Sequence, residues 1–137
     1  MKLCSACLLG VRCSYKGSDK VNDKVVELAK KKYFLPICPE QLGGLPTPRP
    51  ATEIKNGRII TKEGEDQTEG YLKGVEETLK LCQILGIKEA VLKQYSPTCG
   101  CGKIFDGSFS GKVIKGDGIL TKLLKSKGIK VISEDDL

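Results

Sequence analysis

With 137 residues, the chain is long enough to bury a core without disulfide cross-links, and we expect residues 1–137 to form one domain. It contains no histidine, which excludes Ser-His and Cys-His nucleophile pairs and the commonest nitrogen ligand of metals. The net charge of +6 fits either a solvated, lysine-rich surface or an anionic partner such as a nucleotide or RNA. Four Tyr, three Phe and no Trp offer little surface for base stacking, so nucleic acid is the less favoured partner.

The chain also lacks the marks of export or membrane insertion. No apolar run approaches the roughly 20 residues that span a bilayer, and the N-terminal segment is too short for a signal peptide. We therefore expect a cytoplasmic protein with no membrane partner. In a reducing cytosol, seven cysteines, an odd number, indicate metal binding or catalysis rather than disulfides. The sequence assigns no oligomeric state.

The first part of the chain predicts strands alternating with a helix. Residues 2–9 read as a buried strand, residues 20–32 as a helix, and residues 34–37 as a second short strand. The Pro- and Gly-rich residues 39–50 are too interrupted for a helix or a central strand.

The second part begins with Asn56-Gly57 between two β-prone segments, 52–55 and 58–62, which predicts a hairpin. A long helix is predicted over residues 68–85, stopped by Gly86. Its expected buried stripe has spacings of three and four and consists of Leu72, Val75, Leu79, Cys82 and Leu85. The remaining expected elements are a strand over 89–94, a glycine-rich segment through Lys115, a helix over 119–126 and a strand over 129–132.

This alternation predicts an α/β fold, a three-layer Rossmann-like arrangement with a mainly parallel sheet. Sites in such sheets form beyond the carboxyl ends of the strands. Cys7, Cys38 and Cys99 each follow a predicted strand. If those strands are parallel neighbours, the three thiols converge on one crevice.

The cysteines allow several interpretations. Cys82 lies on the apolar stripe of the long helix and reads as a core residue. Cys4-x-x-Cys7 together with Cys99-x-Cys101 would supply four thiolates for a structural zinc site, although Cys4 should point to the other side of its strand. A thioredoxin-like pair at Cys4 and Cys7 lacks the helix that should follow it.

Three ligands rather than four would have a chemical consequence. A cubane [4Fe-4S] cluster held by three cysteines keeps one open iron, which can bind substrate as a Lewis acid. Glu40 lies two residues after Cys38 and is either a base that activates water or a solvated loop carboxylate. Arg12 and Arg49 are candidates for binding a substrate carbonyl or phosphate oxygen, or else form surface ion pairs.

Several segments resemble the bacterial DUF523 family, which includes thiouracil desulfidases and related enzymes that act on thiolated uridine. They are Ser5–Gly10, Cys38–Glu40, Gly43–Pro50, Ser96–Gly100 and Phe105–Gly111. The resemblance implies that Cys7, Cys38 and Cys99 hold a [4Fe-4S] cluster whose open iron takes the thiocarbonyl sulfur. It also implies catalytic roles for Glu40 and Ser96. Cys4, Cys13 and Cys101 lie where the family pattern has no fixed cysteine.

The leading hypothesis is an enzyme that removes sulfur from a small thiolated pyrimidine, thiouracil or a thiouridine nucleotide, without net redox chemistry. Glu40 would act as the base, Ser96 would orient water or substrate, and Arg12 and Arg49 would bind it. One alternative is a non-catalytic zinc or iron–sulfur protein in which Cys4 or Cys101 completes the ligand set. Another is a nucleic-acid-binding module that uses Lys30-Lys31-Lys32.

Overall fold

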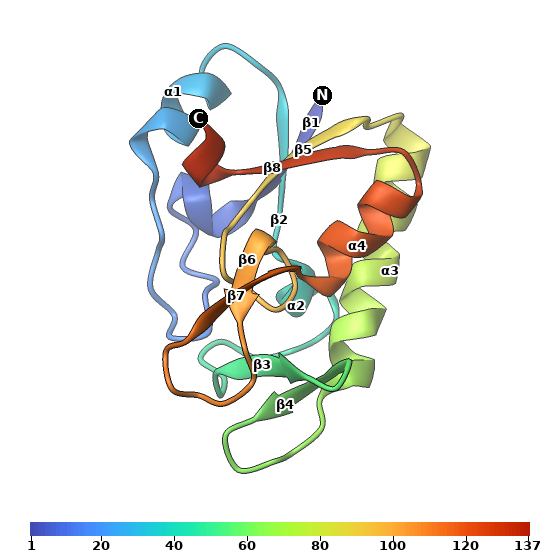
Figure 1. Ribbon diagram of the computed structural model, residues 1–137. Helices are drawn as coiled ribbons and strands as arrows, with labels where there is room; N and C mark the ends of the chain where they lie inside the picture. Colours follow the sequence, from blue (N-terminus) through green and yellow to red (C-terminus); the bar gives the residue numbers. More distant parts are fainter.

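A four-stranded parallel sheet forms the centre of the computed structural model, which describes residues 1–137 (Figure 1). Its spatial order is β2-β1-β5-β8, and all three strand pairings are parallel. The strands are β1 (Lys2–Ser5), β2 (Phe34–Ile37), β5 (Glu89–Leu92) and β8 (Lys130–Ser133). Because β2 lies on one side of β1 and β5 on the other, the sheet has a topological switch point next to β1.

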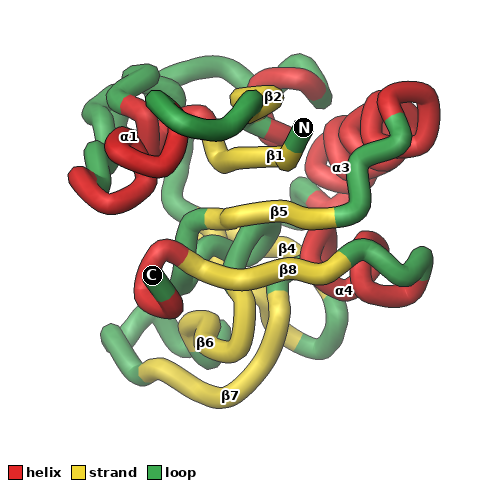
Figure 2. Tube along the Cα trace, turned by 90° about the horizontal axis from the view of Figure 1, so that it is seen from above, coloured by secondary structure: helices red, strands yellow, loops and turns green.

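Helices cover both faces of this sheet, which confirms the predicted three-layer α/β architecture (Figure 2). On one face, α3 (Thr68–Leu85) and α4 (Ile119–Ser126) pack onto the sheet through a core that includes Val75, Leu92 and Leu120. On the other face, α1 (Asp23–Ala29) and the 3-10 helix η1 (Ala6–Leu9) enclose a smaller core around Leu8. None of these helices combines the length and apolarity that crossing a bilayer requires.

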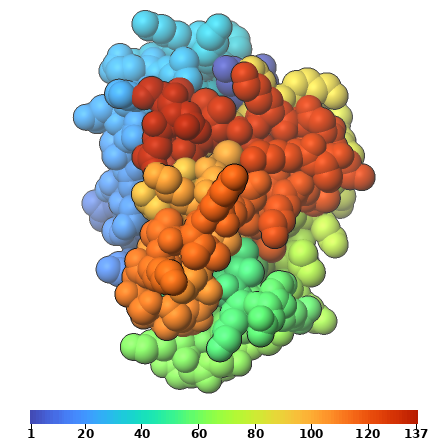
Figure 3. Space-filling view, in the orientation of Figure 1, coloured from blue at the N-terminus to red at the C-terminus, as the bar shows by residue number.

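Two antiparallel hairpins lie outside the main sheet. The first, β3 (Thr52–Lys55) and β4 (Arg58–Thr61), turns at Asn56-Gly57 with positive φ at both residues, as the sequence predicts. The second, β6 (Cys101–Phe105) and β7 (Val113–Asp117), was not predicted, because its strands are glycine-containing and largely exposed. Figure 3 shows the two hairpins side by side, in green and orange.

Four other expectations are corrected by the structure. The first strand ends at Ser5, where the chain turns into η1. Helix α1 is shorter than predicted, because the side chain of Asn22 caps its N-terminus by accepting a hydrogen bond from the Val25 N–H. The third strand stops at Leu92. Finally, a one-turn helix, α2 (Pro39–Leu42), forms inside the Pro- and Gly-rich segment, with Pro39 in the favoured first position.

The buried stripe of α3 is rotated relative to the prediction. Leu72 and Leu85 are 39% and 46% exposed. The stripe that is buried consists of Thr68, Tyr71, Val75, Thr78 and Cys82. Hydroxyl groups on this face find partners, so the polar residues are tolerated; Thr78, for example, donates to the Gly74 carbonyl at 2.7 Å. Cys82 is fully buried, which confirms its place in the core.

Glycines allow α2 to lie directly on α3. A Cβ added at Gly74 would lie 1.7 Å from the Pro39 carbonyl oxygen and 2.9 Å from the Gly43 nitrogen. Backbone atoms therefore meet where a side chain would normally separate the two helices. Because Cys38 caps α2 and Glu40 lies in its first turn, this contact fixes the position of both residues.

We expect Gly74→Ala to lower the free energy of unfolding by about 1–3 kcal/mol, because the added methyl group must push α2 off α3. Urea denaturation measures the change, with the exposed neighbour Lys73→Ala as a control that stays within about 0.5 kcal/mol of the parent. A Gly74→Ala variant as stable as the parent would contradict the direct helix contact.

Candidate metal centre and active-site pocket

A pocket of about 500 Å³ opens beyond the carboxyl ends of β1, β2 and β5. Four cysteines line its wall, together with two carboxylates and five aromatic residues. These are Cys7, Cys13, Cys38, Cys99, Glu40, Glu53, Tyr15, Tyr71, Tyr95, Phe105 and Phe109. Ser96 also lies on this wall, so most of the residues expected at the site share one cavity.

The three cysteines at strand ends converge as the topology predicts. Cys7 lies in η1 directly after β1, Cys38 follows β2, and Cys99 lies in the loop after β5. Their strands are neighbours in the order β2-β1-β5, so the three loops meet at one edge of the sheet. Residues far apart in the sequence are thereby brought to the same pocket, while their role as metal ligands stays a prediction.

The hydroxyl group of Ser96 fixes the loop that carries Cys99. Ser96 Oγ accepts hydrogen bonds from the backbone N–H groups of Thr98 and Cys99, both at 3.0 Å, and so shapes the turn that presents the thiol. Burial raises the pKa of Cys99 well above its usual range, although hydrogen bonds from Ser5 and Ser96 act in the opposite direction. The pKa of Cys38 is raised by its hydrogen bond with Cys13 and by burial. A metal that binds these thiols must therefore displace their protons.

Cys13 is a fourth thiol at the pocket, and sequence reasoning missed it. It is 1% exposed, and the Cys38 thiol donates to its carbonyl oxygen at 3.6 Å. Its hydrogen bond with Cys38 lowers its pKa, whereas a hydrogen bond with Cys7 and burial raise it, and the net result is a pKa of about 11. The available signal was the C-x5-C spacing across Gly10, whose φ of 98° reverses the chain.

The two cysteines considered as a fourth ligand lie elsewhere. Cys4 is fully buried in the smaller core, where burial raises its pKa to about 12. Cys101 donates to the Val131 carbonyl at 3.4 Å on β8. Neither residue lines the pocket, so Cys13 takes their place as the candidate for a fourth sulfur.

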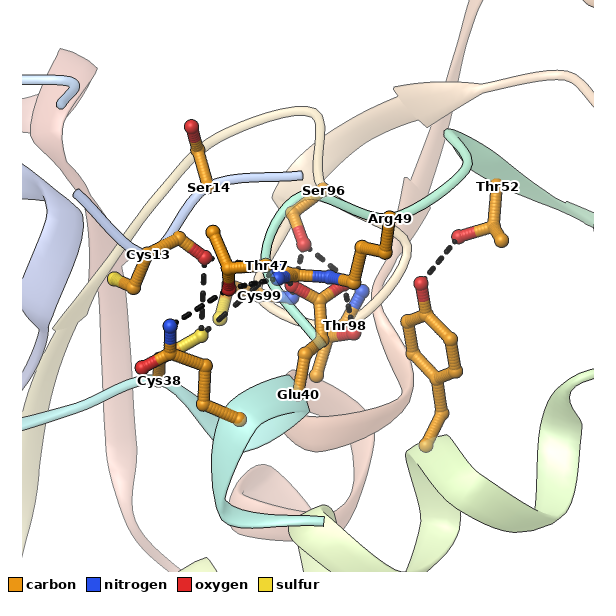
Figure 4. A network of polar contacts seen from close by, with 12 residues as sticks. Cys13, Ser14, Cys38, Glu40, Thr47, Arg49, Thr52, Ser96, Thr98 and Cys99 are labelled. Carbon is orange, nitrogen blue, oxygen red and sulfur yellow. Dashed lines mark hydrogen bonds and ion pairs between the residues drawn. The ribbon is translucent and has the colours of Figure 1, made fainter. Parts of the chain in front are cut away.

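Glu40 reaches the pocket with one carboxylate oxygen already paired (Figure 4). Its Oε2 lies 2.6 Å from Arg49 Nη2, and its Oε1 accepts a hydrogen bond from Thr98 Oγ1 at 3.4 Å. The Glu40 side chain is 16% exposed and that of Arg49 is 2% exposed. The ion pair fixes the orientation of the carboxylate, so that Oε1 points to the loop that carries Thr98 and Cys99.

Neither predicted substrate-binding arginine lies on the pocket wall. Arg12 is exposed. The Arg49 guanidinium is occupied: Nη1 donates to the Pro46 carbonyl and to Thr47 Oγ1, and Nη2 donates to the Cys13 carbonyl at 2.9 Å as well as to Glu40. Arg49 thus joins the Cys13 loop to α2 behind the pocket.

Aromatic side chains form much of the remaining wall. The rings of Tyr95 and Phe105 have centroids 5.8 Å apart at an interplanar angle of 32°. Tyr95 and Phe109 have φ values of 69° and 56°, conformations that non-glycine residues adopt at an energetic cost and that cluster at functional sites. Burial raises the pKa of Tyr71 to about 12, and its hydroxyl accepts a hydrogen bond from Thr52.

The donor set fits a thiophilic metal centre. Several unpaired thiols face one pocket, all seven cysteines are free, and no imidazole is present in the chain. Thiolates favour zinc, copper(I) and iron–sulfur clusters over hard cations such as magnesium or calcium. The cationic charge of such a centre would also offset the cost of burying ionised thiolates.

Comparison with known proteins places the chain in a family. The model of the 2-thiouracil desulfurase family matches residues 3–136. The chain is 42% identical to the uncharacterized protein YbbK of Bacillus subtilis (strain 168), over all of the chain and 97% of that protein. The solved structure of the [4Fe-4S]-dependent thiouracil desulfidase TudS superposes with a TM-score of 0.93 at 43% identity, covering 99% of the chain and 91% of TudS. With both its sequence and its fold matched along nearly the whole length, the chain belongs to the 2-thiouracil desulfurase family.

Proposed function

We propose that the protein is an iron–sulfur-dependent desulfidase, which replaces the exocyclic sulfur of a thiolated pyrimidine by oxygen. One observation carries the proposal: three cysteines from three adjacent strand ends and Glu40 share one pocket, in a chain that matches TudS throughout. The reaction is a hydrolysis, in which the thiocarbonyl compound and water give the carbonyl compound and hydrogen sulfide. No external electron donor or acceptor is needed.

Cys7, Cys38 and Cys99 would hold the cluster. A [4Fe-4S] cluster with three cysteine ligands supplies one open iron, a Lewis acid with affinity for the exocyclic sulfur. The protein contributes the pocket and the loops around it, which are fixed by Ser96 and Arg49. These loops hold the ligand sulfurs in place.

Glu40 is the base in this proposal. Its Oε2 is paired with Arg49, and its Oε1, which accepts one hydrogen bond from Thr98, would take a proton from water. The water oxygen then forms a bond to the ring carbon as the carbon–sulfur bond breaks. Ser96 lies on the pocket wall, where its hydroxyl would orient the water or the substrate.

The pocket can take more than a bare pyrimidine. Its volume of about 500 Å³ lies within the usual range of sites for drug-sized ligands. The rings of Phe105 and Phe109 offer apolar surface for a base. Lys20 lies on the wall and forms no ion pair, so it can receive a phosphate. We infer that a thiouridine nucleotide fits as well as thiouracil.

Anaerobic purification followed by iron and acid-labile sulfide analysis tests the cofactor, with about four of each expected per chain. The purified protein should then release sulfide from 2-thiouracil, 4-thiouracil or 4-thiouridine monophosphate. Cys101→Ser, which changes a thiol outside the pocket, serves as the control and should match the parent. If the protein carries a full cluster but releases sulfide from none of these compounds, the proposed desulfidase function is refuted.

A second candidate function follows from Cys13. Four thiols at one pocket match the number of ligands of a structural zinc ion, which leaves no open position, although they would have to move closer together to hold one ion. Cysteine variants distinguish the two functions. For the cluster enzyme, Cys38→Ser and Cys99→Ser should lose most of the bound metal, whereas Cys13→Ser should keep it. If Cys13→Ser loses metal as fully as Cys38→Ser, and the metal is zinc, the structural site is correct.

A further inference from the structure

Glu53, in β3, connects the two hairpins across the edge of the pocket. Its Oε1 accepts hydrogen bonds from the backbone N–H groups of Gly107, at 2.9 Å, and Phe109, at 3.1 Å. Both donors lie in the loop between β6 and β7, more than fifty residues along the chain. Glu53 forms no ion pair, and its hydrogen-bond partners are these two backbone amides.

The β6–β7 loop lies close against β3 at this point. A Cβ on Gly107 would lie 2.6 Å from the Ile54 carbonyl oxygen, and Gly107 has a φ of 93°. In the space-filling view, the orange residues of the second hairpin lie beside the green residues of the first (Figure 3). The loop therefore comes close enough for backbone amides to reach the Glu53 carboxylate.

These hydrogen bonds act on a residue of the pocket. Phe109 lines the cavity, and so do Glu53 and Gly111. Phe109 has a φ of 56°, which a non-glycine residue holds only when its surroundings impose it. A carboxylate that accepts two N–H groups supplies such a constraint, because hydrogen bonds to an ionised acceptor are stronger than neutral ones.

We propose that Glu53 is a positioning residue that fixes Phe109 in the substrate pocket and so sets the affinity for the pyrimidine ring. The substrate class rests on the proposed desulfidase function. The positioning role of Glu53 acts through its Oε1, which accepts hydrogen bonds from two backbone amides. We expect its effect to fall on substrate binding, because Phe109 lines the pocket, and not on bond cleavage, which we assign to Glu40.

Two variants separate the hydrogen bonds from the charge. Glu53→Gln keeps an oxygen in the place of Oε1, so it should retain the loop and bind 4-thiouracil close to the parent level. Glu53→Ala removes the acceptor. It should raise both the dissociation constant, measured by calorimetry, and KM by at least about tenfold, with kcat little changed. Glu63→Ala, an exposed carboxylate outside the pocket, is the matched control and should behave like the parent.

Hydrogen exchange provides a readout that needs no substrate or turnover. In Glu53→Ala, the Gly107 and Phe109 amides should exchange at least about tenfold faster than in the parent, while amides of the central sheet stay unchanged. Unchanged exchange at these two amides would overturn the positioning role. So would faster exchange accompanied by a fall in kcat alone, or by no change in ligand binding. If the parent itself shows no desulfidase activity, the proposed function fails, and exchange with calorimetric binding still decides the role of Glu53.

Discussion

Replacing Glu40 by Gln is expected to lower the rate of sulfide release from 4-thiouracil by at least about 100-fold, while the iron and sulfide content stays at the parent level. The amide has nearly the same size as the carboxylate but cannot accept the proton of water. Oε2 pairs with Arg49 and Oε1 reaches the pocket, so the variant removes the base without removing a thiol ligand. Single-turnover sulfide release from the anaerobically purified variant measures the effect.

The outcomes of this experiment assign the role of Glu40. Glu63→Gln alters an exposed carboxylate outside the pocket and should leave the rate unchanged. Activity equal to the parent in Glu40→Gln would move the base elsewhere. Loss of the cluster would instead make Glu40 a ligand, or a support for one.

The second large effect is expected from Arg49→Met, which should lower the free energy of unfolding by about 3–5 kcal/mol. The variant leaves the largely buried Glu40 carboxylate without its cationic partner and the Cys13 carbonyl without its donor. Urea denaturation measures the loss. Arg49→Lys should recover only part of it, because one ammonium group cannot reproduce the planar fork that contacts several acceptors.

A surface pair provides the matched control for Arg49. Arg58 lies 2.7 Å from Asp66, but both side chains are about half exposed, at 53% and 42%. Water screens such pairs, so Arg58→Ala should cost no more than about 1 kcal/mol. If Arg49→Met were as stable as Arg58→Ala, the buried pair of Arg49 and Glu40 would not stabilise the connection between the Cys13 loop and α2.

Local signals predicted the long elements well. Helix α3 begins and ends where its periodicity and Gly86 indicate, and the first hairpin follows its Asn56-Gly57 turn. Helix α2 escaped prediction because four residues are too few to be helical alone; α2 depends on its contact with Gly74 of α3. The buried stripe of α3 was displaced for a related reason: Tyr71 and Thr78 are buried because of their hydrogen-bond partners, which hydrophobicity does not report.

The sequence by itself determined the fold class and the meeting of Cys7, Cys38 and Cys99 at one pocket, because parallel strands deliver the residues that follow them to the same edge of the sheet. Only the tertiary structure decided which other residues join them. In the structure, Arg49 pairs with Glu40 and does not line the pocket, where the sequence predicted that it would bind substrate. The tertiary structure also brought Cys13 to the pocket and tied Glu53 to Phe109. The physical reason is that these contacts depend on a few hydrogen bonds and ion pairs between separate segments, which impose no periodicity or composition on the segments that form them.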